Sequence, residues 1–160
     1  MLMRDIEIQL TDPASSEARG LIDQLDAYLT GMYPRESNHL LPVEALREPN
    51  VVFLVARIDG RAAGCGAFVN QRGEYAEIKR MYVVPEFRGL QIGRRMLEAL
   101  EARAQNAGLS VARLETGVWQ PEALGLYERA GYERRGPFGS YREDPLSVFM
   151  EKKLSASGQE

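Results

Sequence analysis

The sequence predicts a single mixed α/β domain with a mostly antiparallel central sheet and flanking helices. Strand-like segments follow one another from Val51 to Val84, separated by turns at Asp59-Gly60 and Gly73, as in an antiparallel meander. Segments with helical periodicity lie on both sides of this meander. The length of 160 residues suits one hydrophobic core and is short for two domains.

The individual elements follow from the spacing of apolar residues and from the positions of glycine and proline. Apolar residues at helical spacing predict helices, and Gly108 ends the longest helix after the meander. The expected helices are Ser15–Met32, Val43–Arg47, Gly89–Ala107 and Pro121–Ala130. The expected strands are Asp5–Leu10, Val51–Ile58, Arg61–Asn70, Tyr75–Val84, Ser110–Val118, Tyr132–Arg135 and Leu146–Lys153. The domain is expected to span residues 1–154, with a disordered tail at 155–160.

Composition and charge argue against several function classes. The net charge is -3 and the basic residues are spread along the chain, so neither nucleic acid nor a membrane surface is an expected partner. No apolar run approaches the ~20 residues of a membrane span, and charge at Arg4 and Asp5 interrupts any signal peptide. The single Cys65 and single His39 make a poor set of zinc ligands. We expect a cytoplasmic protein that uses no metal, with Cys65 as a buried packing residue.

The strongest functional motif is the expected strand-to-helix turn at residues 88–93, RGLQIG. The first N–H groups of a helix lack intrahelical partners and carry the positive end of the helix dipole, so they favour an anion such as pyrophosphate. Gly89 and Gly93 allow a ligand close to the main chain, and Arg88 and Arg94 add positive charge. Taken alone, the same pattern also fits an ordinary turn with surface arginines.

A resemblance to a known family decides between an anion-binding loop and an ordinary turn. The residues from Tyr82 to Gly93 resemble the signature of the GNAT superfamily of N-acetyltransferases, Arg/Gln-x-x-Gly-x-Gly/Ala, with Gln91 where glycine is usual. Residues 123–132, ALGLYERAGY, resemble the family's second motif, Ala-x-x-Leu-Tyr-Glu-Lys-x-Gly-Phe, and Gln120 stands where the family often has asparagine. The segments 77–81, 114–117 and 143–150 resemble the bacterial YsnE-type branch. The implied fold is the GNAT-like acyl-CoA N-acyltransferase fold.

The resemblance implies an enzyme that transfers an acetyl group from acetyl-CoA to a primary amine of a small molecule or amino acid by direct attack. In the family, the pantetheine arm pairs with the fourth strand, and the matching positions here are Met81 and Val83. The implied cofactor-binding residues are Met81, Val83, Arg88, Gly89, Gln91, Ile92, Gly93, Arg94 and Gln120.

The same comparison nominates the acid and the base. Tyr127 falls on the motif tyrosine and is the candidate general acid, with a packing role as the alternative. Glu77 has the spacing before Arg88 of the catalytic glutamate in the histone-acetylating branch and is the first candidate for the base. Glu115, on the strand across the cleft, is the second, and an ion-paired structural role is the alternative for both. His39 and water are the remaining alternatives for the base.

The acceptor side is less defined. The segment after the first long helix usually covers the acceptor site in this superfamily, which nominates Tyr33, Glu36 and His39, together with Glu115. Trp119 is expected to lie in the core. A protein N-terminal or lysine acetyltransferase and a non-catalytic acyl-CoA-binding sensor remain alternative functions. The C-terminal strands of the superfamily often pair between subunits, which leaves a homodimer open.

Overall fold

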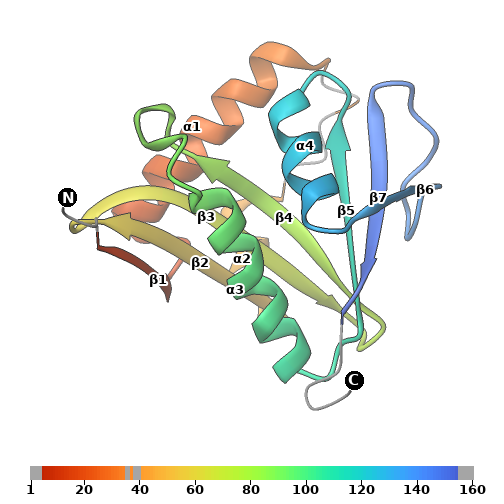
Figure 1. Ribbon diagram of the computed structural model, residues 1–160, viewed down its shortest axis with the longest axis horizontal. Coiled ribbons are helices and arrows are strands. Elements are labelled where there is room, and N and C mark those ends of the chain that lie inside the picture. The colour runs from red at the N-terminus through yellow and green to blue at the C-terminus, as the bar shows by residue number, and fades with distance from the viewer. Residues whose placement is uncertain (1–4, 35–36, 38–40, 155–160) are drawn as a thin grey trace.

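The computed structural model describes residues 5–34, 37 and 41–154, and these form one twisted sheet with helices on both faces (Figure 1). Within this part of the chain the sheet has the order β1-β2-β3-β4-β5-β7-β6. Neighbouring strands are antiparallel except for β4 and β5, which are parallel. The mixed, mostly antiparallel fold expected from the sequence is therefore confirmed. The expected disordered tail, residues 155–160, lies outside the described residues.

The elements have these bounds. The strands are β1 (Ile6–Leu10), β2 (Val51–Ile58), β3 (Arg61–Gln71), β4 (Tyr75–Val83), β5 (Val111–Gly117), β6 (Glu133–Arg135) and β7 (Ser147–Lys153). The helices are α1 (Ser16–Met32), α2 (Val43–Leu46), the short 3-10 helix η2 (Pro85–Phe87), α3 (Ile92–Asn106) and α4 (Pro121–Arg129).

Most expected elements are present with small differences at their ends, and the exceptions lie between β4 and α3. The expected helix start at Gly89 is wrong, because Gly89 and Gln91 have φ angles of 87° and 67°, which no right-handed helix contains. These two residues form the turn before α3. The helix η2 had no signal in the sequence beyond Pro85.

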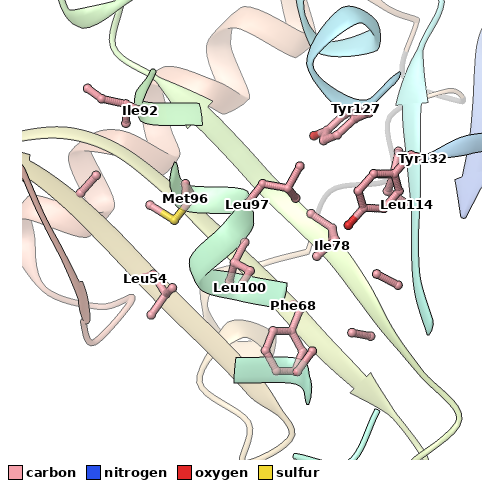
Figure 2. Close-up of a cluster of buried hydrophobic side chains, with 14 of the residues drawn as sticks. Leu54, Phe68, Ile78, Ile92, Met96, Leu97, Leu100, Leu114, Tyr127 and Tyr132 are labelled. Atoms are coloured by element: carbon pink, nitrogen blue, oxygen red, sulfur yellow. The ribbon is translucent and has the colours of Figure 1, made fainter. Parts of the chain in front are cut away.

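Two hydrophobic clusters hold the helices to the sheet. On one face, Met96, Leu97 and Leu100 of α3 pack against Leu54 and Phe68 of the sheet (Figure 2). On the other face, α1 contributes Ala18, Leu21 and Ile22 to a second cluster. Burial of each large apolar side chain is worth about 1.5–3 kcal/mol, so both faces contribute to the stability of the sheet. Among the described residues, no helix is long and apolar enough to cross a membrane.

The strands β4 and β5 diverge, and this opens the sheet at its centre. They pair only where Ala76–Ile78 meets residues 112–114, whereas β5 and β7 pair from Val111 to Gly117. Beyond Ile78 the two strands separate (Figure 1). The backbone groups in the second half of β4 therefore have no β5 partner within the described chain, and they face the gap.

A β-bulge lies at the point where β4 leaves β5. Cys65 pairs with Tyr82 and Ala67 with Lys79, so Arg80 and Met81 together oppose the single residue Gly66. Arg80 has a φ of 61°, in the left-handed region. Arg80 is a buried residue, and its guanidinium pairs with Asp26 of α1 and donates to the carbonyl of Leu41. These contacts hold the bulge in place.

Candidate active site

The N-terminus of α3 is open to a ligand. Gln91 is the residue before the helix, and its side chain accepts no hydrogen bond from the first helical turn. The N–H groups of that turn are therefore available to an anion. Gln91 adopts the left-handed conformation that glycine adopts without strain, so the departure from the family motif is accommodated at a cost of about 1–2 kcal/mol.

A cavity of about 590 Å³ lies over this helix start, between β4 and α4, and is called here the α3 cavity. It brings together all of the residues expected to bind the cofactor: Met81, Val83, Arg88, Gly89, Gln91, Ile92, Gly93, Arg94 and Gln120. The Arg88 side chain is fixed at its edge, because its Nε donates to the carbonyl of Val83 at 3.2 Å. Arg94 is exposed and also pairs with Glu98 at 3.3 Å.

The α3 cavity also contains residues that the sequence analysis did not name. Ala123, Leu126 and Ala130 line it from α4, together with Tyr127. These positions share one helical face, so their spacing within the second motif was a usable signal. Arg129, which stands at the lysine position of the second motif, lines it as well. Tyr28 also lines it, and no sequence pattern marked that residue.

A smaller cavity of about 110 Å³, called here the inner chamber, lies at the gap between β4 and β5. Tyr33, Lys79, Arg80 and Glu115 are among its lining residues. It shares Leu25, Met81, Gln120, Ala123 and Tyr127 with the α3 cavity. The two cavities therefore meet at a common wall, and Tyr127 is part of that wall.

Tyr127 is a buried phenol in the wall that the two cavities share. The residue is 6% exposed and packs edge-to-face against Tyr132, with ring centroids 5.9 Å apart. Figure 2 shows its hydroxyl pointing toward β4. Burial raises the pKa of Tyr127, and the negative charge of Glu115 raises it further, so the phenol stays protonated at neutral pH. Tyr127 thus packs in the core and also borders both cavities.

Glu115 is the carboxyl group that shares the inner chamber with Tyr127. It accepts a hydrogen bond from the Ser147 hydroxyl at 2.8 Å. Burial raises the pKa of Glu115 to about 7; the Ser147 hydrogen bond and the charge of Lys79 oppose this shift, and Glu77 and Asp144 add to it. A carboxyl group that titrates near neutral pH is suited to accept a proton from an amine.

Glu77, the first candidate for the base, lies elsewhere. It is 5% exposed and lines a separate cavity of about 1040 Å³, called here the outer cavity, between β4, α2 and the loop before β7. Its carboxylate accepts hydrogen bonds from Gln71 at 2.9 Å, from the Tyr141 hydroxyl at 2.7 Å and from Lys79 at 3.3 Å. Glu77 therefore borders the outer cavity and is not among the residues that line the inner chamber.

Tyr33 lies in the wall of the inner chamber, as expected for the acceptor side. Its hydroxyl accepts the backbone N–H of Trp119 at 2.9 Å, and the two rings stack 5.1 Å apart. The expectation that Trp119 lies in the core is wrong, because this side chain is 50% exposed and covers Tyr33 from outside. Glu36 and His39, the other acceptor-site candidates in this segment, lie outside the described residues.

Ser37 ties the same segment to the other side of the chamber. Its hydroxyl donates to Asp144 at 2.7 Å, across the loop before β7. Cys65 is buried as expected, and burial raises the pKa of its thiol to about 12. In the described part of the chain, no group of three or more histidine, cysteine or acidic residues is placed to hold a metal ion.

Comparison with known proteins identifies the family. Residues 18–132 match the model of the acetyltransferase (GNAT) family. The chain belongs to this family. It is therefore an acyltransferase, and the α3 cavity coincides with the segments that carry the GNAT motifs.

Relatives of similar length agree with this identification. The chain is 50% identical over 153 residues to an IAA acetyltransferase of Azospirillum brasilense, covering 95% of this chain and 100% of the relative. It is 34% identical over 152 residues to the N-acetyltransferase YsnE of Bacillus subtilis, covering 93% and 100%. The resemblance to the YsnE-type branch is thereby confirmed.

Solved structures show the same fold. A putative acyl-CoA N-acyltransferase from Klebsiella pneumoniae superposes with a TM-score of 0.80 at 40% identity, covering 94% of this chain and 98% of the other. The PaiA N-acetyltransferase of Thermoplasma acidophilum, solved with coenzyme A, gives a TM-score of 0.70 at 20% identity, with coverage of 93% and 99%. At that identity the likeness concerns the fold alone.

Proposed function

We propose that this protein is an acetyl-CoA-dependent N-acetyltransferase that acetylates a primary amine of a small molecule by direct attack. One observation carries the proposal: Tyr127 is part of the wall between the α3 cavity, which contains the GNAT loop, and the inner chamber, which contains Glu115. A donor and a proton acceptor therefore flank the junction of two cavities, one for each substrate.

The residues of the α3 cavity fit acetyl-CoA. The open first turn of α3 would hold the pyrophosphate, with Gly89, Gln91 and Gly93 at the main-chain surface and Arg88 at the edge. The unpaired backbone of β4 at Met81 and Val83 would hold the pantetheine arm in the gap beside β5. When bound, acetyl-CoA supplies the acetyl group and the thiolate leaving group.

The proton transfers can be assigned to residues at the junction. An alkylamine of pKa ~10 is only about one part in a thousand neutral at pH 7, so loss of its proton is part of the reaction. We assign that proton to Glu115, which we prefer to Glu77 because it lines the same chamber as Tyr127. Tyr127 then donates its proton to the sulfur of the leaving group. We propose that no metal ion is required for these steps.

The size of the inner chamber favours a small acceptor over a protein. Its volume of about 110 Å³ is below the ~150 Å³ of an engineered apolar cavity that binds benzene. The name of the relative from Azospirillum brasilense, IAA acetyltransferase, also supports a small-molecule acceptor. A sensor without catalysis is disfavoured because the proposed acid and base both border the chamber.

The test is release of free CoA thiol from acetyl-CoA with a panel of amines, amino acids, aminoglycosides and peptides. We expect turnover with small primary amines and a strong loss of kcat/KM in Glu115→Gln, with a weaker effect of Glu77→Gln. Tight CoA binding without turnover on any acceptor would contradict the enzyme and favour a non-catalytic acyl-CoA-binding sensor. A larger loss in Glu77→Gln than in Glu115→Gln would return the role of the base to Glu77.

A further inference from the structure

Lys79 lies where the inner chamber and the outer cavity meet. It lines both cavities, and only Leu41 shares this property among the residues that line them in the described chain. Its side chain is largely buried on β4, directly before the bulge at Arg80. A buried ammonium group beside a chamber that contains a carboxyl group affects the proton affinity of that carboxyl.

The position of the Lys79 ammonium group is fixed by the outer cavity. Its Nζ donates to Glu77 at 3.3 Å and to the Tyr141 hydroxyl at 2.9 Å, and it lies 5.6 Å from the centre of the Tyr141 ring. Tyr141 is held in turn by ring contacts with Phe138 and Phe149, with centroids 5.1 and 5.4 Å away. The sheet and the loop before β7 therefore position this charge together.

Groups from every surrounding element act on Glu115. They are Lys79 and Glu77 from β4, Ser147 from β7 and Asp144 from the loop before it. Tyr33, at the end of α1, and Tyr127 of α4 also face Glu115; burial raises the pKa of both phenols, and the negative charge of Glu115 raises it further. Arg80 also lines the chamber, but its guanidinium is engaged by Asp26 and by the carbonyl of Leu41. Within this set, Lys79 is the cation that acts on Glu115.

We propose that Lys79 is a positioning residue of the reaction: held by Glu77 and Tyr141 at the wall between the two cavities, its charge keeps the Glu115 carboxylate ionised and ready to accept the proton of the amine. The inference rests on the proposed function, in which Glu115 is the base. No proton leaves Lys79 in the cycle. Its positive charge lowers the pKa of Glu115 against the effect of burial, and the negative charge of Glu77 raises it.

A second group of side chains provides a matched control for the cluster of Lys79, Glu77 and Tyr141. On another part of the sheet, Lys152 pairs with Glu101 at 2.9 Å and lies 5.7 Å from the centre of the Tyr132 ring. Tyr132 donates to the same Glu101 at 2.8 Å. This second cluster also joins a lysine and a tyrosine to one glutamate, but neither Lys152 nor Glu101 lines the inner chamber. Substitutions there reproduce the structural loss without the electrostatic effect on Glu115.

The first measurement is a direct titration of Glu115. Protein labelled with ¹³C at glutamate side chains is titrated by NMR, and the Glu115 signal is assigned by its loss in Glu115→Gln. We expect Lys79→Met to raise the Glu115 pKa by about half a unit to one unit, because an opposite charge is removed and Glu77 is left unpaired. Glu77→Gln is expected to lower it, and Lys79→Arg, Lys152→Met and Glu101→Gln to leave it close to the wild-type value.

The second measurement is the pH dependence of kcat/KM for one amine with the same variants. The acidic limb of the pH profile is expected to shift to higher pH in Lys79→Met and to lower pH in Glu77→Gln, and to stay in place in Lys152→Met. An unchanged Glu115 pKa in Lys79→Met, or an equal shift in Lys152→Met, overturns the inference whatever the activity. A shifted Glu115 pKa with an unmoved kinetic limb supports the electrostatic coupling and overturns the assignment of Glu115 as the base.

Discussion

At the scale of single residues, Gln91 shows how this chain departs from its family without losing the loop. Its φ angle of 67° is one that glycine adopts freely and that other residues adopt at a cost of about 1–2 kcal/mol. Gln91 is solvent-exposed, so the strain is not compensated by burial of its side chain. The amides of the next turn remain available because the side chain does not cap them.

Replacement of Gln91 by glycine is therefore expected to stabilise the protein. The gain in the free energy of unfolding should be up to about 1 kcal/mol, because relief of strain exceeds the greater freedom of glycine in the unfolded chain. Urea denaturation of Gln91→Gly and Gln91→Ala measures the difference, since alanine keeps the Cβ and the strain. Equal stability of the two variants would show that the left-handed conformation carries no cost here.

Glu115 links the chemistry to stability through pH. Its folded pKa of about 7 lies above that of an unfolded glutamate, so the folded state binds the proton more tightly. The contribution of Glu115 to stability is thus full below the unfolded pKa near 4.5 and is lost as the pH rises to about 7.

The variant Glu115→Gln removes the loss of stability that the wild type shows as the pH rises. Its stability relative to the wild type is expected to increase between pH 4.5 and pH 7 by roughly 1–3 kcal/mol, since one pKa unit corresponds to about 1.4 kcal/mol. Denaturant unfolding at pH 4.5, 6 and 8 measures this difference, and the exposed Glu98→Gln serves as the control. A difference that does not change with pH would mean that Glu115 titrates as an ordinary surface carboxyl.

At the scale of elements, the chamber depends on how α1 and the turn after β5 fit together. Tyr33, at the end of α1, lies directly over Gly117, where an added Cβ would be 1.9 Å from the tyrosine hydroxyl oxygen. Trp119 covers the ring from the other side. Glycine at position 117 is therefore required by close contact and not by its backbone angles.

A side chain at Gly117 is expected to displace Tyr33. Gly117→Ala should lower the free energy of unfolding by about 1–3 kcal/mol and raise the KM for the amine more than that for acetyl-CoA, because Tyr33 borders the inner chamber and not the α3 cavity. Gly31→Ala, in the exposed last turns of α1 with nothing within 4 Å, is the control and should stabilise by up to about 1 kcal/mol. Unfolding curves and steady-state kinetics give both quantities; equal KM values for the amine in wild type and Gly117→Ala would contradict the placement.

Local sequence signals were sufficient for most elements and for the α3 cavity. The turn at Asp59-Gly60, with φ angles of 50° and 81°, is set by residues that are adjacent in the sequence, and so are the two motifs. The sequence alone therefore shows where they lie. The surroundings of Glu115 were harder to predict. The divergence of β4 from β5 opens the inner chamber that Lys79 and Ser37 line, and the return of β7 brings Ser147 to Glu115. The alternation of side chains along a strand could not show whether Glu77 or Glu115 lines the inner chamber, because that depends on which cavity lies against each residue.

At the scale of the whole molecule, the sheet is opened at the one parallel pair in its described part, and the inner chamber lies at this opening. The α3 cavity is lined mainly by β4, the start of α3 and α4, with Leu25 and Tyr28 of α1, while Tyr33 and Lys79 line the inner chamber. Tyr127 of α4 borders both. In the proposed function, acetyl-CoA and the amine therefore occupy two cavities that meet at a wall containing the Tyr127 phenol.

This arrangement predicts that loss of the Tyr127 hydroxyl separates binding from chemistry. In Tyr127→Phe the ring and its contact with Tyr132 remain, so the affinity for CoA, measured by calorimetry, should stay within about twofold of wild type. The kcat should fall by about 10² or more, the usual contribution of a general acid. Phe87→Leu, which changes an aromatic lining residue of the α3 cavity away from the inner chamber, is the comparison and should weaken CoA binding more than it lowers kcat. An unchanged kcat in Tyr127→Phe across the pH range would leave Tyr127 as a packing residue and assign protonation of the thiolate to water.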